Sequence, residues 1–563
     1  MSERVLAGVP ASPGTAFGAV RRVDVVGEID DTILNESARP AAAAHARGAL
    51  ARAARELEEL ATRLRTEGRN DEADILDAGM MMAEDPMLLD AVDSAVLDRG
   101  LTAASAIRVE VESAAALLDT LGDEELAARA SDVRSLGRRA LRILSHESVR
   151  VDRASVGDSI LVATDLGPAD VIELDGDVRG IALADGGVTG HAAIVARGLG
   201  LPMVVGIGSE LMRLHEGETC IVDGDQSMVI ASPDAQRLER VRTAMTAAAA
   251  ARDRAMASRA LPTVTRDGRT VRVLANAATP TEVRAALEAG AGGLGLLRTE
   301  LAFLEAKHWP TVAEHRRTLD PVLAQLHGLT ATVRLLDFGG DKTPPFLKGV
   351  FGRGVELLLE DTDALAAQLE AILEVGDATD LRILIPMVTE PAQVRAVRAA
   401  IEPIAARRRS RVPLVAAMVE VPAAAVMADR IAPEVGMFSI GTNDLTSFQL
   451  GIDRTRPGGA PAHHPAVLQL IADTVDAARV AGIPVEVCGE AASNPLVMPL
   501  LVGLGVDELS VGAAAVARVR SWVRALDYEE AAAIALRALR AESATEVESL
   551  ERPLRALLDD AGE

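Results

Sequence analysis

The chain has 563 residues, and a rule of one domain per about 150 residues suggests roughly three or four domains instead of one core. Apolar residues make up 49% of the chain and aromatic residues only 2%, so the cores must be built mainly from Ala, Leu and Val. The net charge of −25 argues against nucleic-acid binding, because neutralising phosphates requires clustered Lys and Arg. An acidic surface serves solubility and would attract a basic protein partner.

The two cysteines, Cys220 and Cys488, lie far apart and form no CxxC pair. This argues against a disulfide framework or a zinc site and fits a reducing compartment. The N-terminal residues lack the apolar stretch of a signal peptide, and no run of about 18 apolar residues occurs. We therefore expect a cytoplasmic protein without membrane insertion.

Short β-like runs occupy residues 4–22, and a helical pattern rich in Ala, Leu, Glu and Arg follows from about 36 to 145. β-like runs return beyond 147, with one helix expected to begin near His191. This order predicts an α/β domain made of residues 1–30 and 147–232, with a domain of roughly four to five helices, residues 31–146, inserted into it. Residues 233–260 are rich in Ala and Arg and are expected to form a helical linker between mobile domains or an ordinary surface helix.

Eight β-like runs, each followed by a helical stretch, fill residues 261–563. The alternation predicts a C-terminal (β/α)8 TIM barrel, and a doubly wound open sheet is the alternative that also alternates strands with helices. The runs are VRVLANA (271–277), GGLGLLR (292–298), TVRLLDF (332–338), LRILIPMV (381–388), PLVAAMVEV (413–421), MFSIGTND (437–444), PVEVCGE (484–490) and ELSVG (508–512).

In a (β/α)8 barrel the functional side chains come from the C-terminal ends of the strands. Oxygen ligands with room for water suit Mg2+, and arginines bind phosphate and carboxylate through two hydrogen bonds. The run ends therefore predict a site for Mg2+ and a small phosphorylated acid, although for any one residue alone a surface ion pair is the simpler explanation. The residues are Arg298, Glu300, Arg334, Asp337, Lys342, Glu420, Asn443, Asp444, Arg454, Cys488 and Glu490.

A second candidate site is the glycine-rich segment that leads into His191. Glycines allow close approach of an anion to the backbone, and the N-terminus of a helix offers N–H groups and a positive dipole end to phosphate. A neutral imidazole at that place can act as a nucleophile near pH 7. A histidine at a helix start is, taken alone, more often structural or merely exposed.

Several blocks resemble, in the family's order and over nearly the whole chain, those of enzyme I of the bacterial phosphoenolpyruvate-dependent sugar phosphotransferase system. The phosphohistidine signature corresponds to GGVTGHAAIVARGLGLPMVVG, and the phosphoenolpyruvate- and metal-binding signatures correspond to MFSIGTNDLTSFQLGIDR and MVEVPAA. Further similar blocks are GVPASPG, EADILDAGMMMAEDP, DVRSLGRRAL, GLGLLRTELAFL, VRLLDFGGDK, HHPAVL and VEVCGEAA.

The resemblance implies a multidomain α/β protein with a swivelling phosphohistidine domain, an inserted helical domain that binds the carrier protein HPr, a helical linker and a barrel that binds phosphoenolpyruvate and forms a homodimer. It also implies the reaction, in which phosphate passes from phosphoenolpyruvate to the chain's own histidine and then to HPr, with release of pyruvate. That is the first step of sugar uptake by this system.

Residue roles follow from the same resemblance, position by position. His191 would carry the phosphate, and Cys488 would protonate enolpyruvate, although a buried cysteine can equally be a small apolar residue. The remaining roles would be substrate binding by Arg298, Arg334, Arg353, Asn443, Asp444 and Arg454, and Mg2+ binding by Glu420 and Asp444.

Three positions depart from the family's pattern. Gly190 replaces the usual Ser before the histidine, which leaves Thr189 to orient the imidazole. Near the substrate, Arg353 is kept but Glu356 stands where a second arginine is usual. In the helical insertion Gly79 replaces a frequent His, so the details of carrier docking stay open.

Three other functions fit parts of the pattern. An enzyme of the pyruvate phosphate dikinase or phosphoenolpyruvate synthase kind would need a nucleotide-binding region before His191, and we do not expect one because His191 lies close to the start of the sequence. A degenerate paralogue that senses phosphoenolpyruvate is supported only by Gly190 and Glu356. A nitrogen-signalling paralogue would carry an extra N-terminal sensory domain, whereas the opening motif here begins at Gly8.

Overall fold

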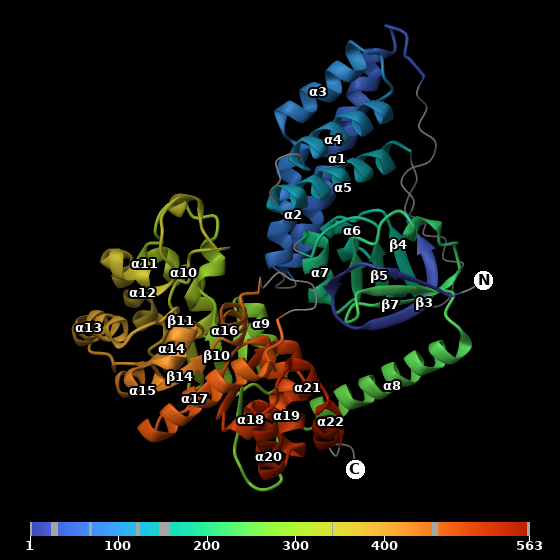
Figure 1. Cartoon of the computed structure of the whole chain (residues 1–563). Helices are drawn as coiled ribbons and strands as arrows, with labels where there is room; N and C mark the ends of the chain where they lie inside the picture. The colour runs from blue at the N-terminus through green and yellow to red at the C-terminus, as the bar shows by residue number, and fades with distance from the viewer. Residues whose placement is uncertain are drawn as a thin grey trace. The chain divides into compact units, whose positions relative to one another are not determined.

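The computed structural model describes residues 3–23, 32–66, 70–119, 124–145, 158–174, 176–188, 190–340, 342–452 and 460–559. The chain divides into two compact units, Met1–Ala248 and Ala249–Glu563, and the boundary lies within helix α8 (Ala235–Ala257). Figure 1 shows both units, which are described separately below. Among the described residues, no helix has the length and apolarity needed to cross a membrane.

The first unit contains an eight-stranded mixed sheet in the order β1-β8-β7-β3-β4-β5-β6-β2. Strands β3, β4, β5 and β6 run parallel, and the outer strands pair antiparallel with their neighbours. The three N-terminal strands thus share a sheet with strands that follow the helical segment. The bounds are β1 Arg4–Ala7, β2 Val9–Ser12, β3 Thr15–Arg22, β4 Ser159–Ala163, β5 Val178–Leu183, β6 Met203–Val205, β7 Thr219–Asp223 and β8 Met228–Ala231.

Alternation along the central strands gives this sheet two apolar faces. Leu161, Leu183 and Met203 point to one face and pack with helices α6 (Pro168–Ile172) and α7 (His191–Leu199). Ile160 and Val204 point to the opposite face, where Leu211 and Leu214 cover them. One face of the sheet therefore carries the helix that begins at the candidate histidine.

Five helices form the inserted bundle that the helical pattern predicts: α1 Arg39–Thr66, α2 Asn70–Ala83, α3 Pro86–Leu97, α4 Ala103–Asp119 and α5 Glu124–Leu144. Their shared core consists mostly of Ala and Leu, as the composition requires. Asp85 caps α3 by accepting a hydrogen bond of 2.7 Å from the backbone N–H of Met87, which satisfies one of the unpaired donors at the start of a helix.

Helix α5 is anchored to the sheet by polar contacts along one side. The Ser131 hydroxyl donates to Asp165 at 2.6 Å, and the Ser135 hydroxyl donates to Asp170 at 2.9 Å. Gly167 permits this approach, because a Cβ there would lie 2.1 Å from the Ser135 oxygen. The bundle and the sheet are therefore in close contact beside α6.

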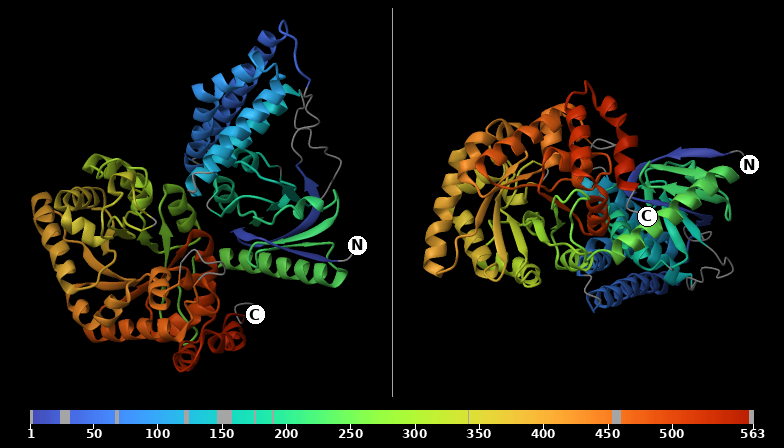
Figure 2. Two further views of the ribbon diagram at one scale, coloured as in Figure 1. Left: turned by 45° about the horizontal axis from the view of Figure 1, so that its top comes forward. Right: turned by 90° about the horizontal axis from the view of Figure 1, so that it is seen from below.

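The second unit is a closed barrel of eight parallel strands, which confirms the TIM barrel and excludes the open sheet. Its helices form an outer layer around the strands, as both views in Figure 2 show. The strands are β9 Arg272–Ala277, β10 Gly293–Leu297, β11 Thr330–Arg334, β12 Asp380–Ile385, β13 Leu414–Val419, β14 Met437–Ile440, β15 Val485–Val487 and β16 Glu508–Gly512. The helices are α9 Pro280–Glu288, α10 Val312–Leu323, α11 Val355–Glu360, α12 Thr362–Val375, α13 Pro391–Arg408, α14 Pro422–Val426, α15 Ala428–Ile431, α16 Thr442–Leu450, α17 Pro465–Ala481, α18 Val497–Leu504, α19 Val516–Ala525, α20 Tyr528–Leu539, α21 Ala544–Glu548 and α22 Glu551–Asp559.

Each of the eight predicted runs overlaps one of these strands, but the third run is shifted. Strand β11 begins at Thr330 and ends at Arg334, whereas the run was expected to continue to Phe338. Leu335, Leu336 and Phe338 are buried in the loop after the strand, so their apolar character reflects burial and not pairing. Asp337 therefore lies on a loop and not on the strand.

His315 of α10 makes the stability of the barrel depend on pH. Its ring is fully buried and packs edge-on against Phe303, with ring centroids 5.0 Å apart. Neither ring nitrogen has a hydrogen-bond partner among the described residues. Burial lowers the pKa of His315 to about 4, although the charge of Glu314 opposes the shift.

The folded pKa lies below the unfolded value, so the unfolded chain binds the proton more tightly and acid favours unfolding. This contribution to stability is complete above about pH 6.5 and is lost as the pH falls toward 4. Between pH 7 and pH 5 we expect His315 to reduce the free energy of unfolding by about 2 kcal/mol, and His315→Leu to abolish that part of the decrease.

Both tryptophans, Trp309 and Trp522, lie in the second unit, so urea unfolding followed by tryptophan fluorescence reports on the barrel. His308→Gln, at an exposed position, is the control and should keep the wild-type pH dependence. If His315→Leu also keeps it, the buried ring is not the cause.

Candidate functional site

His191 is the first residue of α7, and glycines determine the approach of the chain to it. Gly186 has a φ of +97°, and Gly190 forms the N-cap without any side-chain hydrogen bond. The Arg197 guanidinium donates a hydrogen bond of 2.7 Å to the carbonyl oxygen of Val188, which links the end of the helix back to this turn. The imidazole therefore lies where backbone N–H groups and the helix dipole favour an anion.

The partner of the imidazole comes from the helical bundle. His191 Nδ1 lies 2.8 Å from an oxygen of Asp132 on α5. Asp132 is only 6% exposed, whereas the imidazole side chain is 25% exposed. A carboxylate at Nδ1 favours the tautomer with the proton on that nitrogen, which places the ring's lone pair on Nε2.

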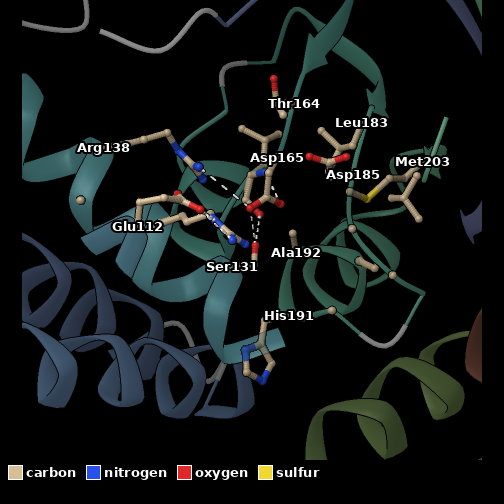
Figure 3. A pocket seen from close by; sticks show the side chains of 18 of the residues that line it. Glu112, Ser131, Arg138, Thr164, Asp165, Leu183, Asp185, His191, Ala192 and Met203 are labelled. Carbon is tan, nitrogen blue, oxygen red and sulfur yellow. Dashed lines mark hydrogen bonds and ion pairs between the residues drawn. The ribbon is translucent and has the colours of Figure 1, made fainter. Parts of the chain in front are cut away.

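A cavity of about 910 Å³ lies between the bundle and the sheet, and His191 is at its edge. Figure 3 shows the imidazole pointing away from the group formed by Ser131, Arg138 and Asp165. Burial raises the pKa of Asp165, although Arg138 opposes the shift from 3.9 Å away. This part of the cavity wall is therefore polar, and the ring points away from it. Thr189, predicted to orient the ring, lies outside the described residues.

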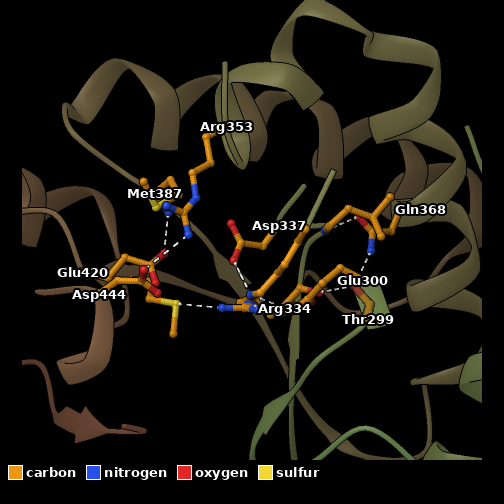
Figure 4. A network of polar contacts seen from close by, with 12 residues as sticks. Thr299, Glu300, Arg334, Asp337, Arg353, Gln368, Met387, Glu420 and Asp444 are labelled. Atoms are coloured by element: carbon orange, nitrogen blue, oxygen red, sulfur yellow. Dashed lines mark hydrogen bonds and ion pairs between the residues drawn. The ribbon is translucent and has the colours of Figure 1, made fainter. Parts of the chain in front are cut away.

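The mouth of the barrel holds a buried network of charges around Arg334, drawn in Figure 4. The Arg334 guanidinium hydrogen-bonds Glu300 and lies 3.3 Å from Asp337. Lys342 lies 3.1 Å from Glu300 and 3.0 Å from Asp337. Burial opposes the charge of Arg334, but these carboxylates and Glu420 raise its pKa above the usual range. The cation is thus permanent.

Glu420, which directly follows β13, and Asp444, in the first turn of α16 after β14, face this network. One oxygen of Glu420 accepts a hydrogen bond of 2.8 Å from the backbone N–H of Met387. Burial and the nearby charges of Asp337 and Asp444 raise the pKa of Glu420 to about 7, with Arg334 opposing the shift. Two carboxylates that repel each other in a buried site would gain from a bound cation.

Arg353 brings a second guanidinium to this side of the mouth. Its Nη2 lies 3.3 Å from Asp444, and its carbon lies 5.7 Å from the centre of the Phe448 ring. The adjacent Met387 has a φ of +54°, a strained value for a residue other than glycine. A Cβ on Gly354 would lie 2.8 Å from the Cβ of Met387, so close packing keeps this backbone in place.

Cys488 closes the inner side of the site. Its side chain is 2% exposed, and the Ser439 hydroxyl donates to its sulfur at 3.3 Å. Burial and Glu486 raise the pKa of the thiol to about 12, with Arg334 opposing the shift. The thiol is therefore protonated at neutral pH and can act as an acid.

The remaining predicted residues are less closely grouped. The side chain of Arg298 is exposed at the end of β10, and Asn443 accepts a hydrogen bond of 3.0 Å from the backbone N–H of Glu490. Arg454 lies outside the described residues. Glu356, one of the departures from the family pattern, is exposed in the first turn of α11.

The residues present fit Mg2+ better than a metal that needs a closed protein cage. Over the described parts of the chain, no set of three or more His, Cys, Asp or Glu side chains is grouped as metal ligands. Mg2+ usually takes one or two carboxylates and completes its shell with water and substrate oxygens. The paired carboxylates of Glu420 and Asp444 meet that requirement.

Sequence reasoning missed Asp132. The residue lies in the middle of a helix, 59 positions before the histidine it contacts, and an aspartate there is typical of a solvated helix face. Only the resemblance of the DVRSLGRRAL block to the family pointed toward this part of α5.

Removing Arg334 should test the charge network. Arg334→Met leaves Glu300 and Asp337, both fully buried, with Lys342 as their cation in this network. Breaking a buried ion pair from one side costs about 3–5 kcal/mol, and we expect a loss of that size in barrel unfolding measured by tryptophan fluorescence at pH 7. Arg353→Met, which removes one partly exposed pair, should cost no more than about 1 kcal/mol. If both variants lost the same free energy of unfolding, Arg334 would not be the residue that compensates the buried carboxylates.

Comparisons with known proteins find relatives for most of the chain. Family models of PEP-utilising enzymes match three parts of the chain: the N-terminal region at residues 7–129, the mobile domain at 156–227 and the PEP-binding domain at 252–528. The first two lie in the first unit, and the third covers the barrel strands.

Curated relatives match the chain along most of its length. A phosphoenolpyruvate-protein phosphotransferase of Haloferax volcanii is 36% identical over 88% of this chain and 90% of its own. The Bacillus subtilis protein of that name is 32% identical over 93% of this chain and 95% of its own. A multiphosphoryl transfer protein of Rhodobacter capsulatus is 35% identical over 97% of this chain and 67% of its own. The chain spans about two thirds of that protein and 54% of its counterpart from Xanthomonas campestris. With three matching family models and near-full-length relatives, the chain is an enzyme that belongs to the phosphoenolpyruvate-protein phosphotransferase family of PEP-utilising enzymes.

Proposed function

We propose that this chain catalyses the first step of the phosphotransferase system: it takes phosphate from phosphoenolpyruvate onto His191, passes it to a histidine of HPr and releases pyruvate. The observation that carries the proposal is the imidazole at the start of α7, with Nδ1 held 2.8 Å from the Asp132 carboxylate. That contact engages Nδ1 and leaves Nε2 as the nitrogen that carries the phosphate. The P–O bond of phosphoenolpyruvate breaks as the N–P bond to Nε2 forms.

The barrel mouth supplies the groups that would bind phosphoenolpyruvate. Arg334 is a permanent cation, and Arg353 lies on the side that carries Asp444. Guanidinium groups bind phosphate and carboxylate through paired hydrogen bonds. We assign Arg298, Asn443 and Arg454 to the same substrate from the resemblance of their sequence blocks to the family, with Arg334 as the central ligand.

Glu420 and Asp444 would hold Mg2+ at this mouth. When bound, Mg2+ neutralises charge on the phosphate and carboxylate oxygens of the substrate. The protein's own contribution is to orient the two carboxylates, and the Met387 N–H fixes Glu420 for that purpose.

Cys488 would complete the reaction at the carbon of the product. Loss of the phosphoryl group leaves enolpyruvate, and the buried thiol donates its proton to the methylene carbon to give pyruvate. The raised pKa of the thiol keeps this proton in place until a strong carbon base is present.

Two sites for one imidazole require movement of His191. We propose that the phosphohistidine domain swivels, so that the ring leaves Asp132 to reach the barrel and returns to deliver phosphate to HPr bound at the inserted helices. We also propose a cytoplasmic location and a homodimer formed through the barrel, as in the resemblance to enzyme I.

Labelling with phosphoenolpyruvate carrying radioactive phosphate tests the acceptor and its tautomer. Wild type with Mg2+ should gain an acid-labile, base-stable label, and His191→Ala should gain none. Asp132→Asn should lower the rate at which labelled His191 passes phosphate to HPr roughly tenfold or more, because at the inserted helices the ring loses the carboxylate that orients it.

Asp165→Asn is the matched control, since Asp165 lies at the same interface but contacts Ser131 and Arg138 instead of the imidazole. It should pass its label to HPr at close to the wild-type rate. Label on His191→Ala would overturn the proposal, and equal rates of transfer to HPr in Asp132→Asn and wild type would overturn the role of Asp132.

Magnesium dependence tests the two carboxylates. A chelator should abolish labelling of the wild type, and Glu420→Gln should raise the Mg2+ concentration needed for half-maximal labelling at least tenfold, roughly, because one charged ligand is lost. Electron paramagnetic resonance with Mn2+ measures the same loss of affinity directly. Full labelling of Glu420→Gln at wild-type Mg2+ concentrations would contradict the assignment.

A further inference from the structure

Asn276 lies near the C-terminal end of β9, and the mechanism above does not use it. The strands follow one another around the barrel in the order β15-β16-β9, so β9 and β15 do not pair directly. The side-chain amide of Asn276 nevertheless donates a hydrogen bond of 2.9 Å to the backbone carbonyl oxygen of Cys488. This amide therefore reaches across β16 to the residue that would protonate the product.

The contacts of the Asn276 side chain fix its amide in one orientation. Its Nδ2 also donates a hydrogen bond of 3.1 Å to the carbonyl oxygen of Ser510, and its Oδ1 accepts one of 2.7 Å from the hydroxyl of Ser510. A backbone carbonyl oxygen can only accept a hydrogen bond, so the amide nitrogen must face the two carbonyl groups. The donors and the acceptor of this partly buried amide are thus used together in one arrangement.

The Asn276 amide acts at the point where regular sheet pairing stops. Strand β15 has only three residues, Val485–Val487, and its pairing with β16 ends at Val487 opposite Leu509. Cys488 is the next residue, so on the β16 side the sheet no longer determines its position. A buried carbonyl group at such a place needs a donor from elsewhere, and Asn276 supplies that donor.

The other contacts that hold Cys488 come from the β14 side of the barrel. The backbone N–H of Cys488 donates a hydrogen bond of 3.1 Å to the carbonyl of Ile440, and the Ser439 hydroxyl donates to the sulfur at 3.3 Å. Gly489 packs against Thr442 so closely that a Cβ on this glycine would lie 1.8 Å from the threonine hydroxyl oxygen. The turn that carries the thiol is therefore held from β14 on one side and from β9, through Asn276, on the other.

We propose that Asn276 is a positioning residue for proton transfer: by holding the carbonyl of Cys488, it directs the thiol at one face of enolpyruvate. This inference rests on the proposed function. In the step itself, the S–H bond breaks as a C–H bond forms at the methylene carbon, and an electron pair of the enolate oxygen forms the carbonyl of pyruvate. The thiolate takes a proton from water after the product has left. A reacting group displaced by about 1 Å can lose on the order of a hundredfold in rate, so the placement of the thiol matters.

Asn276→Ala removes both amide donors, and the stereochemistry of protonation reports where the thiol lies. Phosphoenolpyruvate with deuterium at one of its two C3 positions is converted in tritiated water with Mg2+ and HPr, and the pyruvate is trapped at once as lactate. Wild type should give one configuration of the chiral methyl group, because a fixed thiol protonates one face. Asn276→Ala should lower the ratio of the two configurations roughly tenfold or more, because a displaced thiol leaves enolpyruvate to be protonated by water. Labelling of His191 by radioactive phosphate precedes this step and should stay within about twofold of the wild-type rate.

Asn276→Asp keeps the size of the side chain and the acceptor for Ser510, but its carboxylate has no N–H for Cys488. It should lose the ratio as Asn276→Ala does, which keeps the test decisive if the alanine variant folds poorly. Gln325→Ala is the matched control, because the Gln325 amide also donates to two backbone carbonyls, at 3.1 and 3.0 Å, but lies after α10 in the outer layer of helices. It should keep the wild-type ratio. Tryptophan fluorescence checks that the barrel of each variant is folded.

The wild-type ratio in folded Asn276→Ala and Asn276→Asp would overturn the positioning role. An equal fall of the ratio in Gln325→Ala would overturn it too, because a general loosening of the barrel would then be the cause. Failure of the proposed function is distinguished by the wild type and by Cys488→Ala. If wild type gains no phosphohistidine or gives both configurations equally, or if Cys488→Ala keeps the wild-type ratio, the proposed function or its proton donor is wrong and the role of Asn276 falls with it.

Discussion

A charge buried inside a barrel must be balanced by an opposite charge nearby. At this mouth Arg334 balances the buried carboxylates. The guanidinium lies between Glu300 and Asp337, and all three groups are almost completely removed from water. Such a network gains little over apolar packing but is costly to leave half satisfied. The strain at Met387 and the close approach of Gly354 hold the neighbouring Glu420 in the same way. Stability is thus given up locally so that charged groups keep fixed positions before any ligand arrives.

The charged groups inside the barrel differ along its axis in how they are paired and protonated. Near the N-terminal ends of the strands, Glu508 is paired with Arg382 and Arg272, which is a closed structural network. In the middle, burial and the carboxylate of Glu508 raise the pKa of Glu486 to about 8, which favours its neutral form. At the C-terminal ends, Arg334 remains charged with carboxylates around it. The charged groups that are available to a substrate therefore lie toward the mouth, which is where active sites lie in this fold.

Sequence patterns identified the architecture because burial in a parallel barrel makes strands into short, nearly continuous apolar runs. They could not separate a strand from a buried loop, which is why the run through Phe338 was longer than β11. The bundle was recognisable from helical periodicity, and the strand-end rule placed Arg334, Glu420, Asp444 and Cys488 around one mouth. Asp132 and Glu486 were out of reach for a different reason. Each depends on a long-range juxtaposition, and locally each resembles an ordinary exposed acid on its own element.

Glu420 and Glu486 show how strongly the surroundings of a buried glutamate determine its protonation state. Both are fully buried glutamates with a raised pKa, to about 7 and about 8. Glu420 faces another carboxylate and accepts a hydrogen bond from the backbone N–H of Met387, so a cation in the site would favour its anionic form. Glu486 is buried beside the carboxylate of Glu508, which already pairs with Arg382, so its neutral form is favoured. Neighbours and not residue type thus decide which form each glutamate takes, and the proposed role of Glu420 as a metal ligand depends on them.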